Sequence, residues 1–72
     1  KTLAEDCFYF CHDNEITDER AIGGFLYLLV ERHINQFEHI PLAWLTALRD
    51  PQWPGYYRME TLLKSELGFI PD

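Results

Sequence analysis

Two cysteines and a histidine near the N-terminus are the residues whose types most readily suggest a metal site. Cys7 and Cys11 are four positions apart and His12 follows, so a helix would place both thiols on one face. Structural zinc sites, however, usually take their cysteines from a tight turn in a Cys-x-x-Cys spacing. Both cysteines also share an apolar stripe with Leu3 and Phe10, and free cysteine is among the most buried residue types. We therefore predict a reduced, metal-free pair packed in the core.

The acidic stretch 13–18 begins like a calcium-binding loop but lacks the positions that define one. Such a loop needs glycine at its sixth position and glutamate at its twelfth. Asp18 and Gly24 occupy those positions here. Carboxylates at two solvated helix ends explain the acidic residues better than a calcium site does.

The sequence evidence for a catalytic site is equally weak. The only serine, Ser65, falls late in an expected helix, so no Ser-His-Asp triad can be argued. Gly23 and Gly24 do not form the strand-to-helix turn of a phosphate-binding loop. Glu38 and His39 lie in a connector with no indication of a substrate pocket. The sequence predicts no enzyme, no catalytic residue and no cofactor.

The formal net charge of −6 comes entirely from one window of the chain. Residues 5–19 contain six acidic residues and no lysine or arginine, whereas six acids and six bases balance elsewhere. An acidic surface repels phosphate backbones, so direct binding to nucleic acid is disfavoured. Its natural complement is a protein with a basic surface. The candidate contacts are Asp13, Glu15, Asp18 and Glu19.

Three large aromatic residues surround a stiff turn near the fourth expected helix. Trp53, Tyr56 and Tyr57 flank a Pro-Gly pair, and Arg58 follows them. One helix face can bury Tyr56 but cannot also bury Tyr57 and Trp53. Exposed aromatics with a polar tip on a rigid element are typical of interface hot spots. Trp53 could instead fill the gap between two helices, and both interpretations stay open. In the first, Trp53 and Tyr57 bind a partner.

The elements that must position these residues are helices. Thr2 and Glu5 form a capping-box pattern that predicts a first helix over 3–12. Thr17 is the expected N-cap of a second helix over 18–35. Apolar residues in this second helix recur with a helical period. They are Ile22, Phe25, Leu26, Leu29, Val30 and His33.

Gly23 and Gly24 inside the second helix predict the close approach of another helix or a local bend, and a ligand pressed against the bare backbone is the less favoured alternative. Pro41 fits the first turn of a third, almost wholly apolar helix that should be mostly buried and should stop at Asp50. A fourth helix is expected over 56–67. Its predicted inner stripe consists of Tyr56, Met59, Leu63 and Leu67.

These elements predict an all-α fold, a small four-helix domain with short connections over residues 1–72. Leu29 and Leu45 should be nearly fully buried, and Gly68 should end the last helix in a left-handed conformation. Because the chain begins with Lys1, we expect that a leader was removed or that the chain is a piece of a longer protein.

The sequence favours a small acidic protein–protein interaction module: a regulator, adaptor or inhibitor of a basic partner. The alternatives are a helical subdomain of a larger enzyme or receptor and, less favoured, a small metal-binding protein. Two free thiols indicate a reducing compartment, so a cytoplasmic location is expected. The longest apolar run is too short to span a bilayer.

Overall fold

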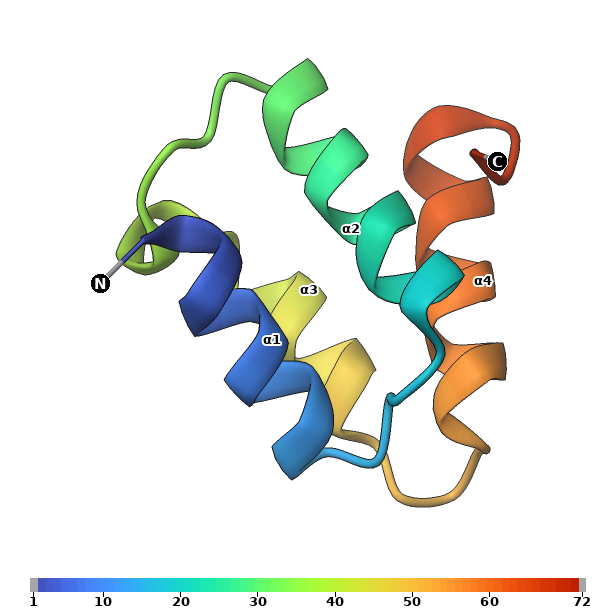
Figure 1. Ribbon diagram of the computed structural model, residues 1–72. Coiled ribbons are helices and arrows are strands. Elements are labelled where there is room, and N and C mark those ends of the chain that lie inside the picture. Colours follow the sequence, from blue (N-terminus) through green and yellow to red (C-terminus); the bar gives the residue numbers. More distant parts are fainter. Residues whose placement is uncertain (1, 72) are drawn as a thin grey trace.

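The computed structural model describes residues 2–71, which form four α-helices and one short 3-10 helix (Figure 1). The elements in order are α1 (Leu3–Asp13), α2 (Glu19–Glu31), η1 (Phe37–His39), α3 (Leu42–Arg49) and α4 (Gly55–Leu67). No strand occurs within the described residues. The predicted all-α, four-helix fold is therefore confirmed.

Both the first and the second helix begin with a side-chain cap. Thr2 and Glu5 make the predicted capping box, in which the Glu5 N–H donates to Thr2 Oγ1 at 3.1 Å. The second N-cap is Asp18 and not the predicted Thr17. The Asp18 carboxylate accepts a hydrogen bond from the Arg20 N–H at 3.1 Å, which satisfies an otherwise unpaired donor in the first turn.

The second helix ends at Glu31, four residues before the predicted end at position 35. His33 has a φ of 59°, and this left-handed residue stops the helix. The N–H groups of His33 and Ile34 turn back to the carbonyls of Val30 and Leu29, at 3.0 and 2.8 Å. This is a Schellman motif with histidine in the place that glycine usually takes.

The buried face of α2 differs from the predicted stripe. Leu28 is fully buried, whereas Val30 is 72% exposed and His33 lies outside the helix on the surface. The helix packs against both α4 and α1, so two neighbours select the buried side chains (Figure 1). At Gly24 an added Cβ would lie 2.7 Å from Leu63 Cδ1, which confirms the predicted close approach of another helix.

The third and fourth helices are less buried than predicted. Leu42 is 71% exposed, so α3 buries only one side: Trp44, Leu45 and Leu48. In α4, Met59 and Leu63 are buried as predicted, but Tyr56 is 58% exposed. Because α4 packs on α2 and α3 at once, its buried face is the broader set Gly55, Arg58, Met59, Leu62 and Leu63. Gly68 ends α4 with a φ of 84°, as predicted.

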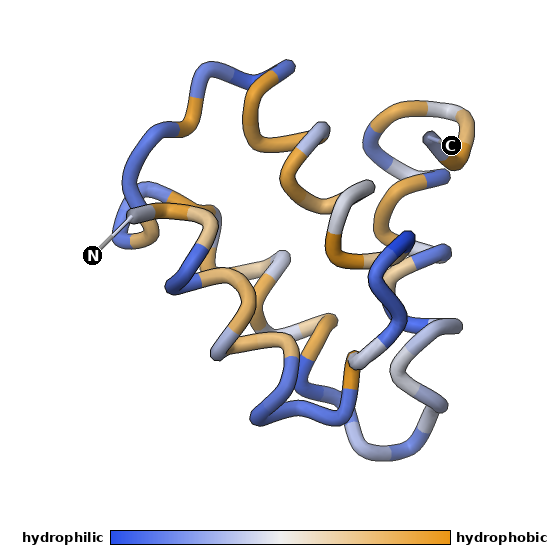
Figure 2. Tube along the Cα trace, in the orientation of Figure 1, coloured by the Kyte–Doolittle hydropathy of each residue, from blue (hydrophilic) through white to orange (hydrophobic). Residues whose placement is uncertain are grey.

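Within the described residues, one cluster of buried side chains lies between the helices (Figure 2). The connections are mostly hydrophilic, but two of their apolar residues, Ile16 and Ile40, belong to this cluster. Leu29 and Leu45 belong to it, in agreement with the sequence. Cys7 and Cys11 are also fully buried there as free thiols, so the prediction that they pack in the core is confirmed.

Candidate functional site

Trp53 does not fill the gap between α3 and α4. Its side chain is 48% exposed and that of Tyr57 is 45% exposed. The two rings pack against each other, with centroids 5.3 Å apart and planes inclined by 39°. The structure thus places both predicted anchor residues on the surface as one half-exposed aromatic pair.

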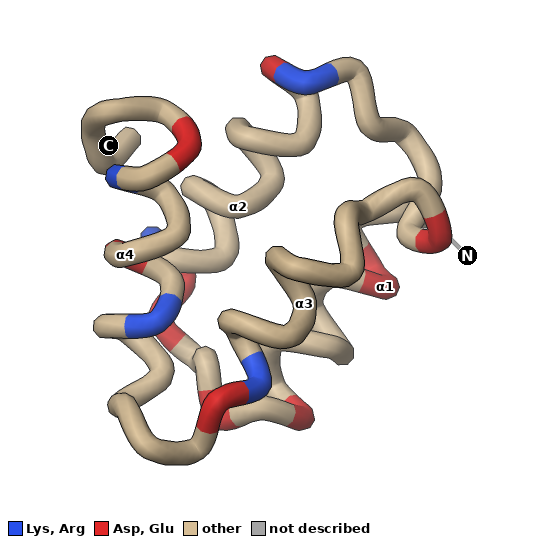
Figure 3. The backbone as a smooth tube through the Cα atoms, turned by 180° about the vertical axis from the view of Figure 1, so that it is seen from behind, with Lys and Arg blue, Asp and Glu red and all other residues tan. Residues whose placement is uncertain are grey.

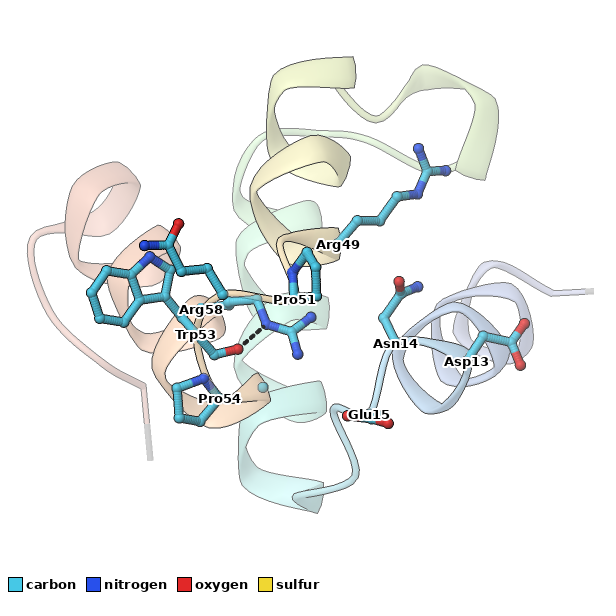
Figure 4. A pocket seen from close by; sticks show the side chains of 10 residues that line it. Asp13, Asn14, Glu15, Arg49, Pro51, Trp53, Pro54 and Arg58 are labelled. Atoms are coloured by element: carbon cyan, nitrogen blue, oxygen red, sulfur yellow. Dashed lines mark hydrogen bonds between the residues drawn. The ribbon is translucent and has the colours of Figure 1, made fainter.

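A groove of about 470 Å³ separates this loop from the connection that follows α1 (Figure 4). We call it the acidic groove. Asp13, Asn14 and Glu15 line one side. Residues 51–55, which include Trp53, line the other side together with two arginines. Packing of distant chain segments therefore brings two of the four predicted acidic residues into one groove with Trp53, whose ring points away from them (Figure 4).

The remaining predicted acids are placed differently. Asp18 and Glu19 are exposed at the start of α2 and do not line the acidic groove. Asp18 is also engaged as the N-cap of that helix. Of the four predicted carboxylates, only those of Asp13 and Glu15 belong to the groove, and the Asp13 side chain points outward from its rim (Figure 4).

The acidic side of the groove is held by the end of α1. Glu15 has a φ of 64°, and its N–H donates to the His12 carbonyl at 3.1 Å. The Ile16 N–H donates to the Cys11 carbonyl at 2.7 Å, and the Ile16 side chain is buried in the core. This second Schellman motif, with its apolar contact, anchors the acidic side to the helix.

Gly55 lets the two sides of the groove meet at their base. A Cβ at this position would collide with the backbone carbonyl of Glu15, which cannot move aside as a side chain could. The start of α4 therefore touches the connection after α1 directly. A Pro-Gly pair read from sequence predicts a turn, but only the fold shows which backbone passes beside the glycine.

Arg58 holds the aromatic side of the groove. Its side chain is only 7% exposed, and its Nε donates to the Trp53 carbonyl at 2.8 Å (Figure 4). Nη1 donates to the Leu48 carbonyl in α3. One guanidinium thus joins the end of α3, the loop and α4. The sequence placed Arg58 beside the aromatics but gave no signal that it would be buried.

A second groove, of about 380 Å³, lies on the other side of the Trp53–Tyr57 pair. We call it the aromatic groove. It runs between α3 and α4, and the side chain of Leu62 forms part of its wall. Asp50 stands at the end of α3, where its Oδ1 accepts a hydrogen bond from the Gln52 N–H at 3.0 Å. The residues that line this groove are Ala47, Asp50, Trp53, Tyr57, Arg58, Thr61, Leu62 and Ser65.

One further aromatic surface was not singled out from the sequence. Phe8 and Tyr9 are exposed on α1, and the Phe8 ring lies 4.1 Å from the ring of His12. The periodicity of α1 does place these residues away from the Leu3–Cys7 stripe, so the signal was present. It predicts exposure but no specific chemistry.

The thiols are poorly suited to chemistry at neutral pH. Burial raises the pKa of Cys7 to about 11, with a smaller contribution from the charge of Asp6. Burial also raises the pKa of Cys11 to about 12, with Cys7 adding to it. Because the thiolate is the nucleophile and the metal ligand, a protonated buried thiol is inert. Among residues 2–71, no three histidine, cysteine or acidic side chains are arranged to hold a metal ion.

None of the helices in the described part of the chain has both the length and the apolar character needed to cross a membrane. Comparison with protein-family models, with curated proteins and with solved structures finds no match to this chain. The two grooves and the aromatic pair between them are therefore the features from which a function must be inferred.

Proposed function

We propose that this chain is a small acidic interaction module that binds a protein partner with a basic surface. The observation that carries the proposal is the half-exposed Trp53–Tyr57 pair: both residues line the aromatic groove, and Trp53 also lines the groove that contains Glu15. Aromatic pairs of this kind supply most of the affinity at many interfaces.

The charge distribution supports a basic partner. Acidic residues from the end of α1, the following connection and the end of α3 lie at one end of the molecule, where the basic residue of the last turn of α3, Arg49, also lies (Figure 3). Both Asp13 and Glu15 are exposed there. Complementary potentials steer encounter and fix orientation, whereas a phosphate backbone would be repelled.

The contacts that hold the loop of the aromatic pair in place support its role as an anchor. Arg58 fixes the Trp53 backbone by a hydrogen bond, and Pro51 and Pro54 restrict the loop on either side. A side chain that is already held in place loses little conformational freedom on binding. The loop therefore presents Trp53 and Tyr57 at low entropic cost.

The second candidate, a helical subdomain of a larger enzyme or receptor, also has an observation in its favour. Val30 and Leu42 are 72% and 71% exposed although both are aliphatic. If the chain belongs to a larger protein, these side chains would face the rest of it. An isolated chain that aggregates and binds an apolar dye would support this candidate, whereas a monodisperse monomer would support the module.

The test of the module is affinity capture with matched tyrosine variants. The immobilised chain is exposed to a lysate of its source, and retained proteins are compared for the wild type, Tyr57→Ala and Tyr56→Ala. Tyr56 is the control because it is adjacent and exposed but lines neither the acidic nor the aromatic groove. We expect a protein with a basic surface that is retained by wild type and Tyr56→Ala and lost by Tyr57→Ala. Retention that is unchanged by Tyr57→Ala, or retention of an acidic protein, would contradict the proposal.

A further inference from the structure

The aromatic groove has the form of a slot for one long side chain. Its walls include Ala47, Leu62 and the stacked rings of Trp53 and Tyr57, so much of the lining is apolar. Thr61 and Ser65 add hydroxyl groups along α4. A volume of about 380 Å³ accommodates a long side chain together with part of its backbone.

One carboxylate gives this slot its charge preference. Asp50 is partly buried, and its Oδ1 is occupied by the Gln52 N–H. Within residues 2–71, Oδ2 has no hydrogen-bond or ion-pair partner. Arg58 also lines the groove, but it is almost wholly buried and two of its nitrogens already donate to backbone carbonyls. Those carbonyls are neutral, so Arg58 keeps its positive charge, but the more exposed of the two charged groups in the lining is the Asp50 carboxylate.

We infer that the aromatic groove binds an arginine side chain of the partner, an inference that rests on the proposed interaction function. The aliphatic stem would lie on Ala47 and Leu62, and the guanidinium would stack on the Trp53–Tyr57 pair. Its planar donor fork would then reach the Asp50 carboxylate. Arginine fits this combination better than lysine because it both stacks on aromatic faces and offers several donors in one plane.

The experiment uses a short capped peptide with one arginine between alanines, titrated into the isotope-labelled chain and followed by NMR. The matched control peptide carries citrulline, which has the same shape without the charge. We expect the arginine peptide to shift the Trp53 indole N–H and the amides of Thr61 and Ser65. It should bind about fivefold or more tighter than the citrulline peptide, as expected for a cation–π contact combined with an ion pair.

Two substitutions at Asp50 and Asp13 separate this groove from its neighbour. Asp50→Asn keeps an oxygen for the Gln52 N–H but removes the charge, so it should reduce the preference for arginine over citrulline to the part that comes from the cation–π contact. Asp13→Asn removes a charge from the acidic groove and should leave that preference unchanged. Trp53→Leu keeps apolar volume but removes the ring, so it should weaken the arginine peptide more than the citrulline peptide.

Equal binding of both peptides would show that the groove takes an apolar side chain and would overturn the inference. Shifts confined to residues 13–15, or a preference that Asp50→Asn leaves undiminished, would do so as well. None of these outcomes touches the proposed function, which fails if the retained protein is acidic or if its capture does not depend on Tyr57.

Discussion

At the scale of single residues, two positions adopt a backbone conformation that favours glycine. Glu15 and His33 have φ values of 64° and 59°, and each ends a helix in a Schellman motif. A side chain with a Cβ pays a conformational cost in this region. Glu15 lines the acidic groove, whereas His33 is simply exposed. Strained residues often gather at functional sites. Comparing Glu15, which lines the acidic groove, with His33, which does not, therefore separates a functional role of the strained conformation from a structural one.

We predict that Glu15→Gly and His33→Gly each raise the free energy of unfolding by roughly 0.5–1 kcal/mol, because the relief of strain exceeds the added chain entropy. Urea unfolding monitored by tryptophan fluorescence measures this. If the proposed function is correct, Glu15→Gly should also slow association with the partner while His33→Gly should not. A loss of stability in either variant would show that the side chain makes contacts worth more than the strain.

The buried thiols predict a loss of stability at high pH. Their ordinary pKa is 9.0, and burial raises the pKa values of Cys7 and Cys11 to about 11 and about 12. Above pH 9 the unfolded chain therefore releases protons that the folded chain retains, so the free energy of unfolding decreases as pH rises from about 9 toward 12.

Thiol titration checks the same prediction. A thiol reagent should label neither cysteine in the native chain at neutral pH and both in denaturant. In a Cys7→Ala/Cys11→Ala variant, the stability loss between pH 9 and 11 should shrink relative to the wild type. Rapid labelling of the native chain would contradict the buried, protonated state.

At the scale of elements, helix limits that carry a local sequence signal were easier to predict than the end of α2 and the buried faces. The capping box of Thr2 and Glu5 is local, so the sequence contains all of its information. The end of α2 at His33 has a weaker signal, because a histidine in the left-handed position that ends a helix is far less common than a glycine there. The choice of Arg58 over Tyr56 for burial depends on how α4 sits between α2 and α3, which no local pattern records.

The buried guanidinium of Arg58 should contribute to stability because it connects α3, the following loop and α4. Removing its guanidinium in Arg58→Ala leaves the carbonyls of Trp53 and Leu48 without their donor, so we expect a loss of roughly 2–4 kcal/mol. Arg58→Lys should lose less because it keeps one donor group. The matched control is Arg49→Ala. That arginine is exposed and lies over the Phe10 ring at 5.4 Å, so its loss should cost about 1 kcal/mol or less.

Urea unfolding of the three arginine variants measures these differences. The Trp53 side chain should also become more mobile in Arg58→Ala, which fluorescence anisotropy detects. Equal stability of Arg58→Ala and Arg49→Ala would mean that the buried guanidinium does not hold α3, the loop and α4 together.

At the scale of the whole molecule, the sequence predicted some of the residues that line the two grooves but not their arrangement. Asp13, Glu15 and Trp53 were identified by charge and residue type, yet residues 13–15 and 51–55 are far apart in the chain. They form one groove because the connection after α1 packs against the start of α4 at Gly55. Such long-range contacts depend on the assembled core, which a local pattern does not specify.

The uneven charge of the whole chain predicts that substitutions of acidic residues change mainly the rate of association with the partner. Exposed charges act over about 8–10 Å at ordinary ionic strength, so added salt should slow association with a basic partner. Asp13→Asn/Glu15→Gln should lower the association rate more than Glu38→Gln/Glu60→Gln, which removes equal charge from exposed positions outside both grooves. Rim charges act mainly in this way.

Trp53→Ala or Tyr57→Ala should instead raise the dissociation rate, because these side chains make contacts only after docking. Surface plasmon resonance against the captured partner, at several salt concentrations, separates the two rates. The unfolding midpoint of every variant is the control for simple destabilisation. If the association rate is indifferent to salt and to Asp13 and Glu15, the acidic end does not steer the partner. If the dissociation rate is also unchanged by both aromatic substitutions, the partner binds at a different surface of the four-helix fold.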